Sequence, residues 1–167
     1  MNEEVSKRQA FVIQHVGATG SNVRVRADRV MERLIKPACR ETGYEAVRAD
    51  QLPAELIVEP IVSALATSPL VIADLGRAPW NDNVLMEVGF RLATGRPIVF
   101  LADTEPVAEE LPLHLQNRRI LAFDAAEPTA NDIADLCEYL THQQREMYGW
   151  RSHYPILEFT VPLRDPN

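Results

Sequence analysis

Short apolar runs alternate along this chain with longer stretches whose apolar residues recur at helical spacing. The stretches predict helices from Asn22 to Gly43, after Asn81, and over residues 54–67 and 128–147. Strands that are apolar throughout and alternate with helices are typical of a parallel sheet covered on both faces. We therefore predict an α/β fold, a three-layer α/β/α sandwich around a doubly wound, mainly parallel five-stranded sheet. The predicted strands are Phe11–Val16, Tyr44–Ala49, Leu70–Leu75, Arg96–Ala102 and Arg119–Phe123.

The size of the chain is enough for one domain. Of its 167 residues 46% are hydrophobic, and a chain of this length buries roughly 70% of its unfolded surface. We expect one domain over residues 1–148 and an extended tail over 149–167 that pairs with the sheet, packs on a partner subunit or leads into a further domain. An exposed sheet edge and the apolar tail favour a homodimer or a higher homo-oligomer.

Charge and composition limit the classes of partner that the protein can bind. The net charge of −7 leaves no basic stripe for a phosphate backbone, so double-stranded nucleic acid is not expected as a partner. The charge does not exclude a small anionic ligand that is held locally. The chain has no run of about 18 apolar residues and no signal peptide, which predicts a cytoplasmic protein without membrane association. Cys39 and Cys137 lack metal-type spacing, so we expect two free thiols in packing and no metal site.

In doubly wound sheets of the flavodoxin or Rossmann type, ligands bind outside the carboxyl ends of the strands. The residues that the predicted strands deliver to this edge are therefore the candidates for ligand binding. They are His15, Gly17, Thr19, Gly20 and Ser21 in the first loop, Asp50 after the second strand, Asp74 in the third, Trp80, Asn81, Asp82 and Asn83 in the turn that follows, and Asp103 after the fourth.

Two of these segments have an ordinary structural explanation as well. The spacing of the glycines in the first loop matches neither the dinucleotide fingerprint nor the P-loop, so the loop either binds a phosphate or ribose hydroxyl or is a tight turn. Trp80 either stacks on a base or packs against Leu85 as a hydrophobic staple, while Asn81 or Asp82 caps the helix.

Glu87 is the most informative residue of the chain. The apolar face of its helix is formed by Val84, Leu85, Val88 and Leu92, and Glu87 lies at the border of that face. Glu87 either forms a surface ion pair with Arg91, one turn later, or converges with Asp74 on a cleft, so that the cleft holds two carboxylates. Two carboxylates in one cleft are the minimum for cleavage of a glycosidic bond, since one stabilises the sugar cation and one transfers protons.

The run VIADLGRAPWNDNVLMEVGFRLATGRPIVFL resembles the nucleoside 2-deoxyribosyltransferase-like superfamily. The resemblance covers roughly residues 10–124 and rests on a strand ending in Ala-Asp-Leu, an Asn-x-Asn-Val turn, a helix with a glutamate before Val-Gly, and a Gly-Arg-Pro strand entry. The position of the glutamate is also similar to that in Toll/interleukin-1-receptor domains that cleave NAD. The resemblance implies that Glu87 is the catalytic glutamate and that Asp74 and Asp82 are the supporting acids.

The sequence departs from that pattern at Met86, at Val88, in the longer turn with Pro79 and Trp80, and at the end of the first strand. The resemblance thus implies an enzyme that cleaves the N-glycosidic bond of a nucleoside, a nucleotide or NAD, with no cofactor, since NAD would be a substrate. Hydrolysis and base exchange both stay open. The alternative is a module of a prokaryotic signalling or defence system that senses nucleotides or binds proteins without turnover.

Overall fold

The computed structural model describes residues 8–51, 58–103 and 111–149 of the chain. The tail expected over residues 149–167 lies outside this part except for Gly149, which is the last residue of a helix rather than the start of an extended segment. Residues 54–57 of the second predicted helix also lie outside it.

The sheet has five strands in the order β2-β1-β3-β4-β5, and all four neighbouring pairs are parallel. This is the strand order of the flavodoxin-like doubly wound fold, so the predicted fold class is confirmed. The strands are β1 (Arg8–Gln14), β2 (Tyr44–Arg48), β3 (Leu70–Asp74), β4 (Ile98–Asp103) and β5 (Ile120–Phe123).

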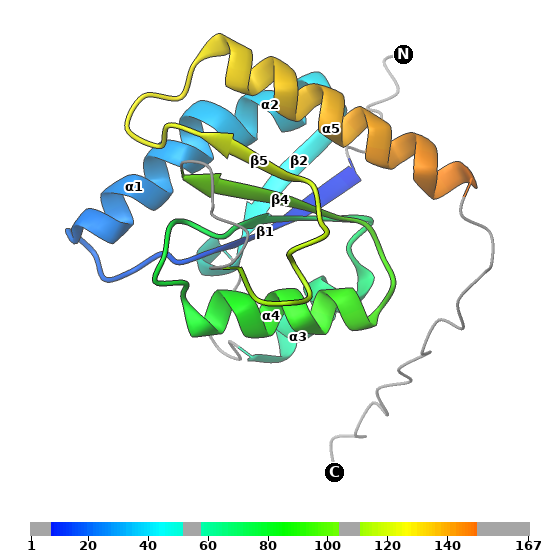
Figure 1. Ribbon diagram of the computed structural model, residues 1–167, viewed down its shortest axis with the longest axis horizontal. Coiled ribbons are helices and arrows are strands. Elements are labelled where there is room, and N and C mark those ends of the chain that lie inside the picture. The colour runs from blue at the N-terminus through cyan, green and yellow to red at the C-terminus, as the bar shows by residue number, and fades with distance from the viewer. Residues whose placement is uncertain (1–7, 52–57, 104–110, 150–167) are drawn as a thin grey trace, which may run out of the picture.

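Helices cover both faces of the sheet, as Figure 1 shows. One face carries α1, α2 and α5, and the other carries α3 and α4. The helices are α1 (Asn22–Val30), α2 (Lys36–Glu41), α3 (Val58–Thr67), α4 (Asp82–Ala93) and α5 (Ala130–Gly149), with a π-helical turn η1 (Met31–Ile35) and a 3₁₀ turn η2 (Ala49–Gln51).

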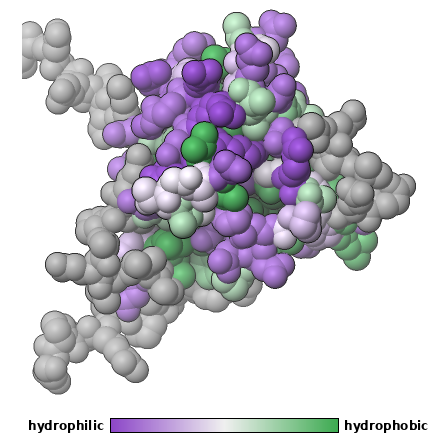
Figure 2. All heavy atoms as spheres, turned by 90° about the vertical axis from the view of Figure 1, so that its left-hand side faces the viewer, coloured by the Kyte–Doolittle hydropathy of each residue, from purple (hydrophilic) through white to green (hydrophobic). Residues whose placement is uncertain are grey.

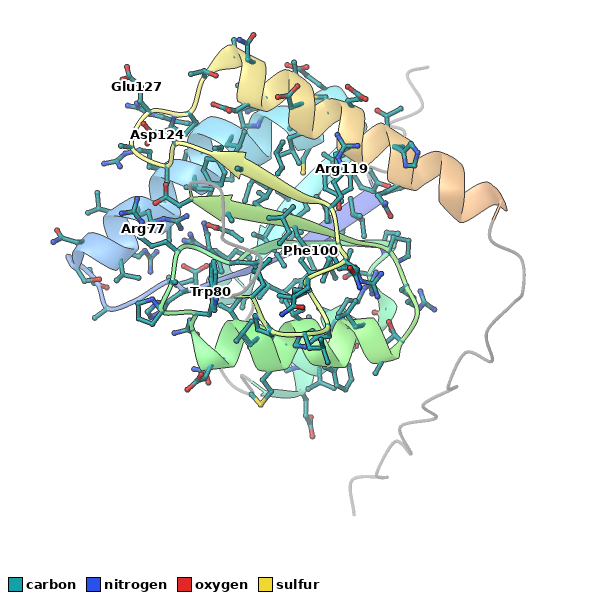
Figure 3. The ribbon with its side chains drawn as sticks, viewed as in Figure 1. Arg77, Trp80, Phe100, Arg119, Asp124 and Glu127 are labelled. Atoms are coloured by element: carbon teal, nitrogen blue, oxygen red, sulfur yellow. The ribbon has the colours of Figure 1, made fainter. Side chains whose placement is uncertain are left out.

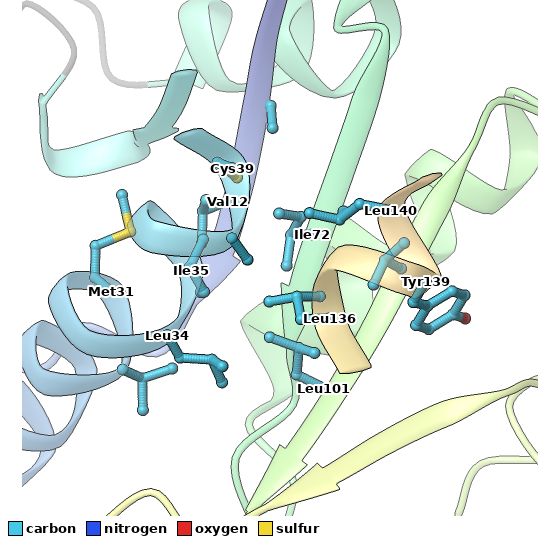
Figure 4. Packing of buried hydrophobic residues seen from close by; sticks show 14 of the residues in the cluster. Val12, Met31, Leu34, Ile35, Cys39, Ile72, Leu101, Leu136, Tyr139 and Leu140 are labelled. Carbon is cyan, nitrogen blue, oxygen red and sulfur yellow. The ribbon is translucent and has the colours of Figure 1, made fainter. Parts of the chain in front are cut away.

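Alternate strand residues build the two cores. Even-numbered residues of β1, β2 and β3 face α1, α2 and α5, where Ile72 and Leu101 pack against Leu34, Ile35 and Leu136 (Figure 4). Odd-numbered residues of β1 and β3 face α3 and α4. Both faces of the sheet are therefore buried, which explains why its central strands are apolar without interruption.

The first predicted helix forms as one continuous helical run, although Pro37 lies inside it. The chain widens into η1 directly before Pro37, and the Lys36 N–H donates to the Met31 carbonyl. Pro37 then takes one of the first two positions of α2, the part of a helix that tolerates proline. Pro60 likewise lies in the first turn of α3.

The ends of several strands differ from the prediction. β1 ends at Gln14 rather than Val16, and β4 begins at Ile98 rather than Arg96. Pro97 has no N–H for a sheet hydrogen bond, and its carbonyl accepts from the Val71 N–H of β3 and from the Arg91 side chain. β2 ends at Arg48, β3 at Asp74 and α5 begins at Ala130, one to two residues from the predicted bounds.

Candidate functional site

Four neighbouring strands place a polar side chain at the carboxyl edge of the sheet. These four side chains are buried and lie on the strand face that packs against α1 and α5: Arg48 on β2, Gln14 on β1, Asp74 on β3 and Asp103 on β4. Gln14 lies opposite Asp74 in the register of β1 and β3. Its amide donates to the Asp74 Oδ2 at 2.8 Å, and Arg48 Nη1 donates to Gln14 Oε1 at 3.1 Å.

Arg26 of α1 forms ion pairs with two of these side chains, Asp74 and Asp103. Its Nη1 and Nη2 donate to the two carboxylate oxygens of Asp74 at 2.9 and 3.0 Å, and its Nε lies 3.5 Å from Asp103 Oδ2. Burial lowers the pKa of Arg26, but the hydrogen bonds and charges of Asp74 and Asp103 outweigh this effect and raise the pKa overall. α1 is thus held to the ends of β3 and β4 by one guanidinium.

A second ionic cluster lies beside the first, at the end of β2. Arg48 donates to Asp28 Oδ1 at 2.7 Å and to both carboxylate oxygens of Asp50 at 2.7 and 2.9 Å, while Arg24 contacts Asp28 and Asp50 at 2.9 and 3.0 Å. The hydrogen bonds from Arg48 are the main reason that the pKa values of both acids are lowered. Asp50, predicted to bind ligand, is therefore an ion-pair partner of two arginines.

Both carboxylate oxygens of Asp74 accept hydrogen bonds from other residues of the protein. Beyond Arg26 and Gln14, Asp74 Oδ1 accepts from the Gly76 N–H at 3.0 Å. Asp103 accepts from the Ala125 N–H at 3.2 Å and from Arg77 Nη2 at 3.1 Å. Arg77 has two thirds of its side chain exposed and lies at the carboxyl edge of the sheet (Figure 3). The ion pairs of Asp74 and Asp103 thus extend to the surface at Arg77.

Glu87 lies on α4, over the opposite face of the sheet. It is the sixth residue of α4, half-buried, and none of the hydrogen bonds or ion pairs among the described residues includes its carboxylate. Burial raises its pKa above the ordinary value. None of those bonds joins Glu87 to Asp74, whose side chain faces α1, so the structure does not bring the two predicted acids into one hydrogen-bonded pair.

Arg91 is not the partner of Glu87. The predicted surface ion pair does not form, because the Arg91 side chain is fully buried and donates to the carbonyls of Leu65, Ser68 and Pro97 at 2.7 to 2.9 Å. Burial, and to a smaller extent the charge of Arg96, lower the pKa of Arg91 to about 9. Its guanidinium donates four hydrogen bonds to these three carbonyls. Arg91 fixes the ends of the segments that lead into β3 and β4.

The turn before α4 has a structural role for most of its residues. Asn81 caps α4, since its Oδ1 accepts from the Val84 N–H at 3.1 Å. Trp80 and Leu85 both pack, half-buried, on the core between the sheet and α4, which agrees with the predicted staple. Asp82 and Asn83 are exposed in the first turn of α4, where the helix N-terminus stabilises a negative charge.

The first loop is a tight turn that begins α1. Gly17 has φ +68°, and a Cβ there would lie 2.8 Å from the Val23 side chain and 2.9 Å from Ser21 Oγ. Ser21 caps α1 by accepting from the Arg24 N–H at 3.1 Å. His15, Thr19 and Gly20 are exposed. Backbone geometry alone thus explains Gly17 and Ser21, and ligand binding by this loop stays a prediction.

The carboxyl edge of the sheet is strongly polar. Figure 2 looks at the side toward which β4 and β5 point in Figure 1, and hydrophilic residues dominate the part of this side drawn in colour. Sequence reasoning missed Gln14, Arg24, Arg26, Asp28 and Arg48 as members of this edge. Gln14 and Arg48 could have been identified because each is a polar residue at the end of an apolar strand, two residues after a side chain that faces the core.

Residues 8–51, 58–103 and 111–149 contain no group of three or more histidine, cysteine or acidic side chains arranged to hold a metal ion. None of the described helices combines the length and the hydropathy needed to cross a bilayer.

No protein-family model matches the sequence, and no curated protein matches it. Among solved structures, a 2-desoxiribosyltransferase from Leishmania mexicana is similar with a TM-score of 0.46 and 14% identity, over 62% of this chain and 70% of that chain. A flavodoxin-like domain from Synechococcus sp. is similar with a TM-score of 0.45 and 12% identity, over 84% of this chain and 98% of that domain. Both likenesses are distant.

Proposed function

We propose that the protein is an N-glycosidase or N-ribosyltransferase that cleaves the bond between ribose and base in a nucleoside, a nucleotide or NAD. The observation that carries the proposal is Glu87, which is half-buried in the second turn of α4 without a partner among the described residues. Burial of an unpaired carboxylate destabilises a fold, and groups placed in this way concentrate at functional sites. A carboxylate is also the group that stabilises a ribosyl cation.

The surroundings of Glu87 support a ribosyl ligand. α4 begins at the carboxyl edge of the sheet, and Glu87 lies about 7.5 Å along its axis from Asp82. Trp80 offers a partly exposed ring on the same side for stacking on a base, and Asp82 and Asn83 offer polar groups for ribose hydroxyls. The reaction needs no cofactor, and the ligand is a small molecule; a homo-oligomeric, cytoplasmic enzyme is part of the same proposal.

The test is incubation of the pure protein with NAD and with a panel of nucleosides, deoxynucleosides and their monophosphates, with and without a free base as acceptor. Chromatography is expected to show release or exchange of a base. The Glu138→Gln variant is a matched control, because Glu138 is exposed on α5 over the other face of the sheet. Absence of cleavage at micromolar enzyme, also after concentration of the protein, would refute the proposal.

A second candidate function is a nucleotide-binding or protein-binding module without turnover. The observation that favours it is the closed ionic network, in which Asp74 and Asp103 are occupied by arginines of the chain itself. Calorimetric titration with the same panel separates the two functions, since the module binds a nucleotide that stays intact.

A further inference from the structure

The helices α1, α2 and α5 form an outer layer in which basic and acidic residues are segregated. Basic residues outnumber acidic ones between Asn22 and Glu41, whereas acidic residues outnumber basic ones in α5. The two helical stretches lie side by side, because Cys137 Sγ of α5 lies 3.8 Å from the Ala38 carbonyl and 3.4 Å from Glu41 Oε2 of α2. Figure 1 shows both stretches on the same face of the sheet. This outer layer therefore has a basic half and an acidic half.

Four exposed side chains present these charges to the surroundings. Arg33 and Arg40 belong to the basic half, and Asp135 and Glu138 belong to the acidic half. None of the four takes part in an ion pair within the part of the chain that the structure describes. Other basic side chains of the same stretch have partners in the chain itself, namely Arg24, Arg26, Arg29 and Lys36. The four exposed charges are thus available to a second molecule.

The charges of the two halves lie at matching levels along the helix axes. Both helical stretches begin at the carboxyl edge of a parallel sheet, so they run in the same direction. The contacts of Cys137 with α2 place this residue level with the middle of α2. Glu138, the next residue of α5, is therefore about level with Arg40. Asp135 lies roughly 7 Å along the axis from Arg33, a distance that the two side chains can span.

This arrangement of charges is complementary to itself. A two-fold axis parallel to the helices would place the basic half of one copy over the acidic half of another and would keep the levels of the charges. Arg40 would then face the partner's Glu138, and the contact would occur twice, since an isologous interface repeats every contact. A two-fold axis perpendicular to the helices would instead place arginine over arginine.

We propose that the outer layer of α1, α2 and α5 docks on the same layer of a second copy of this chain, with α2 over the partner's α5. The net charge of −7 makes other encounters between copies repulsive, whereas this face offers attraction. Each helical stretch is about 30 Å long and the pair is about 20 Å wide, so the contact buries roughly 1,200 Å² in total. This area is near the lower limit for a specific interface, and the dimer is accordingly weak and sensitive to salt.

The proposed interface differs from the sheet edge and the tail, which the sequence suggests as contacts of an oligomer. It also lies across the sheet from α4 and Glu87. Variants of this face are therefore expected to leave base release unchanged, and failure of the proposed dimer leaves the proposed function intact.

The first test is sedimentation equilibrium of the full chain at concentrations up to about 1 mM, in about 50 and about 500 mM NaCl. A monomer–dimer equilibrium is expected, with a dissociation constant at least about 10-fold higher at the upper salt concentration. A protein that stays monomeric at the highest concentration in low salt, or a dimer that salt does not weaken, overturns the proposal.

Charge reversals identify the surface. Arg40→Glu and Glu138→Arg are each expected to remain monomeric where the wild type dimerises, since each variant places two pairs of like charges in the interface. An equal mixture of the two variants is expected to form a heterodimer, because both contacts then join opposite charges. Arg118→Glu changes the net charge as much as Arg40→Glu but is exposed outside these helices, and it is expected to dimerise like the wild type.

Two results with these variants would overturn the proposal. One is dimerisation of either single variant with the dissociation constant of the wild type, which would assign the contact to a sheet edge or to the tail. The other is a mixture that stays monomeric although circular dichroism shows both variants to be folded. If one variant does not fold, Arg33→Glu and Asp135→Arg repeat the test, and the salt dependence of the wild type decides independently of every variant.

Discussion

At the scale of single residues, Glu87 combines partial burial with the absence of a partner among the described residues. Its pKa is higher in the folded than in the unfolded chain. The associated stability is fully present below the unfolded pKa and is lost as pH rises through the folded pKa. The ionised carboxylate thus destabilises the protein at neutral pH, which is the expected signature of a residue kept for function.

The Glu87→Gln variant is expected to be at least as stable as the wild type at about pH 7.5, and its advantage is expected to shrink toward about pH 4.5. Urea unfolding at both values measures the difference. A variant that is less stable at neutral pH and equal to the wild type in acid would show that the carboxylate makes a stabilising contact instead.

Asp74 differs from Glu87 because it belongs to a buried ion pair. Asp74→Ala leaves Arg26 without its main partner and is expected to lower the free energy of unfolding by about 3 kcal/mol. The exposed pair of Glu32 and Lys36 serves as control, and Glu32→Ala is expected to cost less than about 1 kcal/mol. Similar costs for the two variants would refute a special role for the buried pair.

The cysteines are expected to react slowly in the native protein. Burial raises the pKa of Cys39 to about 12, and burial together with the contact of Cys137 with Glu41 raises that of Cys137 to about 11. Few thiolates form at pH 8, so alkylation should run at less than about a tenth of the rate in urea. Mass spectrometry after timed exposure to iodoacetamide measures this, and equal rates in both conditions would contradict the account.

At the scale of elements, α4 depends on its cap for the placement of Glu87. Asn81→Ala removes the acceptor for the Val84 N–H and is expected to cost about 1 kcal/mol in unfolding free energy, whereas Asn81→Ser keeps an acceptor and most of the stability. Thermal unfolding of the three proteins checks the expected order. Equal losses for Ala and Ser would show that the side chain acts by another contact.

The elements were predictable where one local signal dominates. Apolar runs located all five strands, and Asn81 and Gly43 marked helix ends, because caps and left-handed glycines are local effects. The accommodation of Pro37 was not predictable, since the wide turn of η1 is decided by how the helix packs rather than by residue preference. Nor was the burial of Arg91, since its carbonyl partners Leu65 and Ser68 lie 26 and 23 residues away in the sequence.

At the scale of the whole molecule, the order of elements along the chain was sufficient for the fold, because parallel strands with helical crossovers allow few arrangements. The site was only partly predictable. That Asp74 lies at the carboxyl edge follows from its position at the end of a strand. Its orientation toward Arg26 depends on which face of the sheet the even-numbered side chains of β3 point to, and on where α1 packs. The sheet separates Asp74 from Glu87 for the same reason.

The most direct test of the central claim, that the Glu87 carboxylate supports cleavage of a ribosyl bond, is the release of free base by Glu87→Ala with and without added formate. The account predicts a rate at least about 100-fold below that of the wild type, partly restored by formate and not by chloride at equal ionic strength. A Glu87→Ala protein that releases base at the wild-type rate would contradict it.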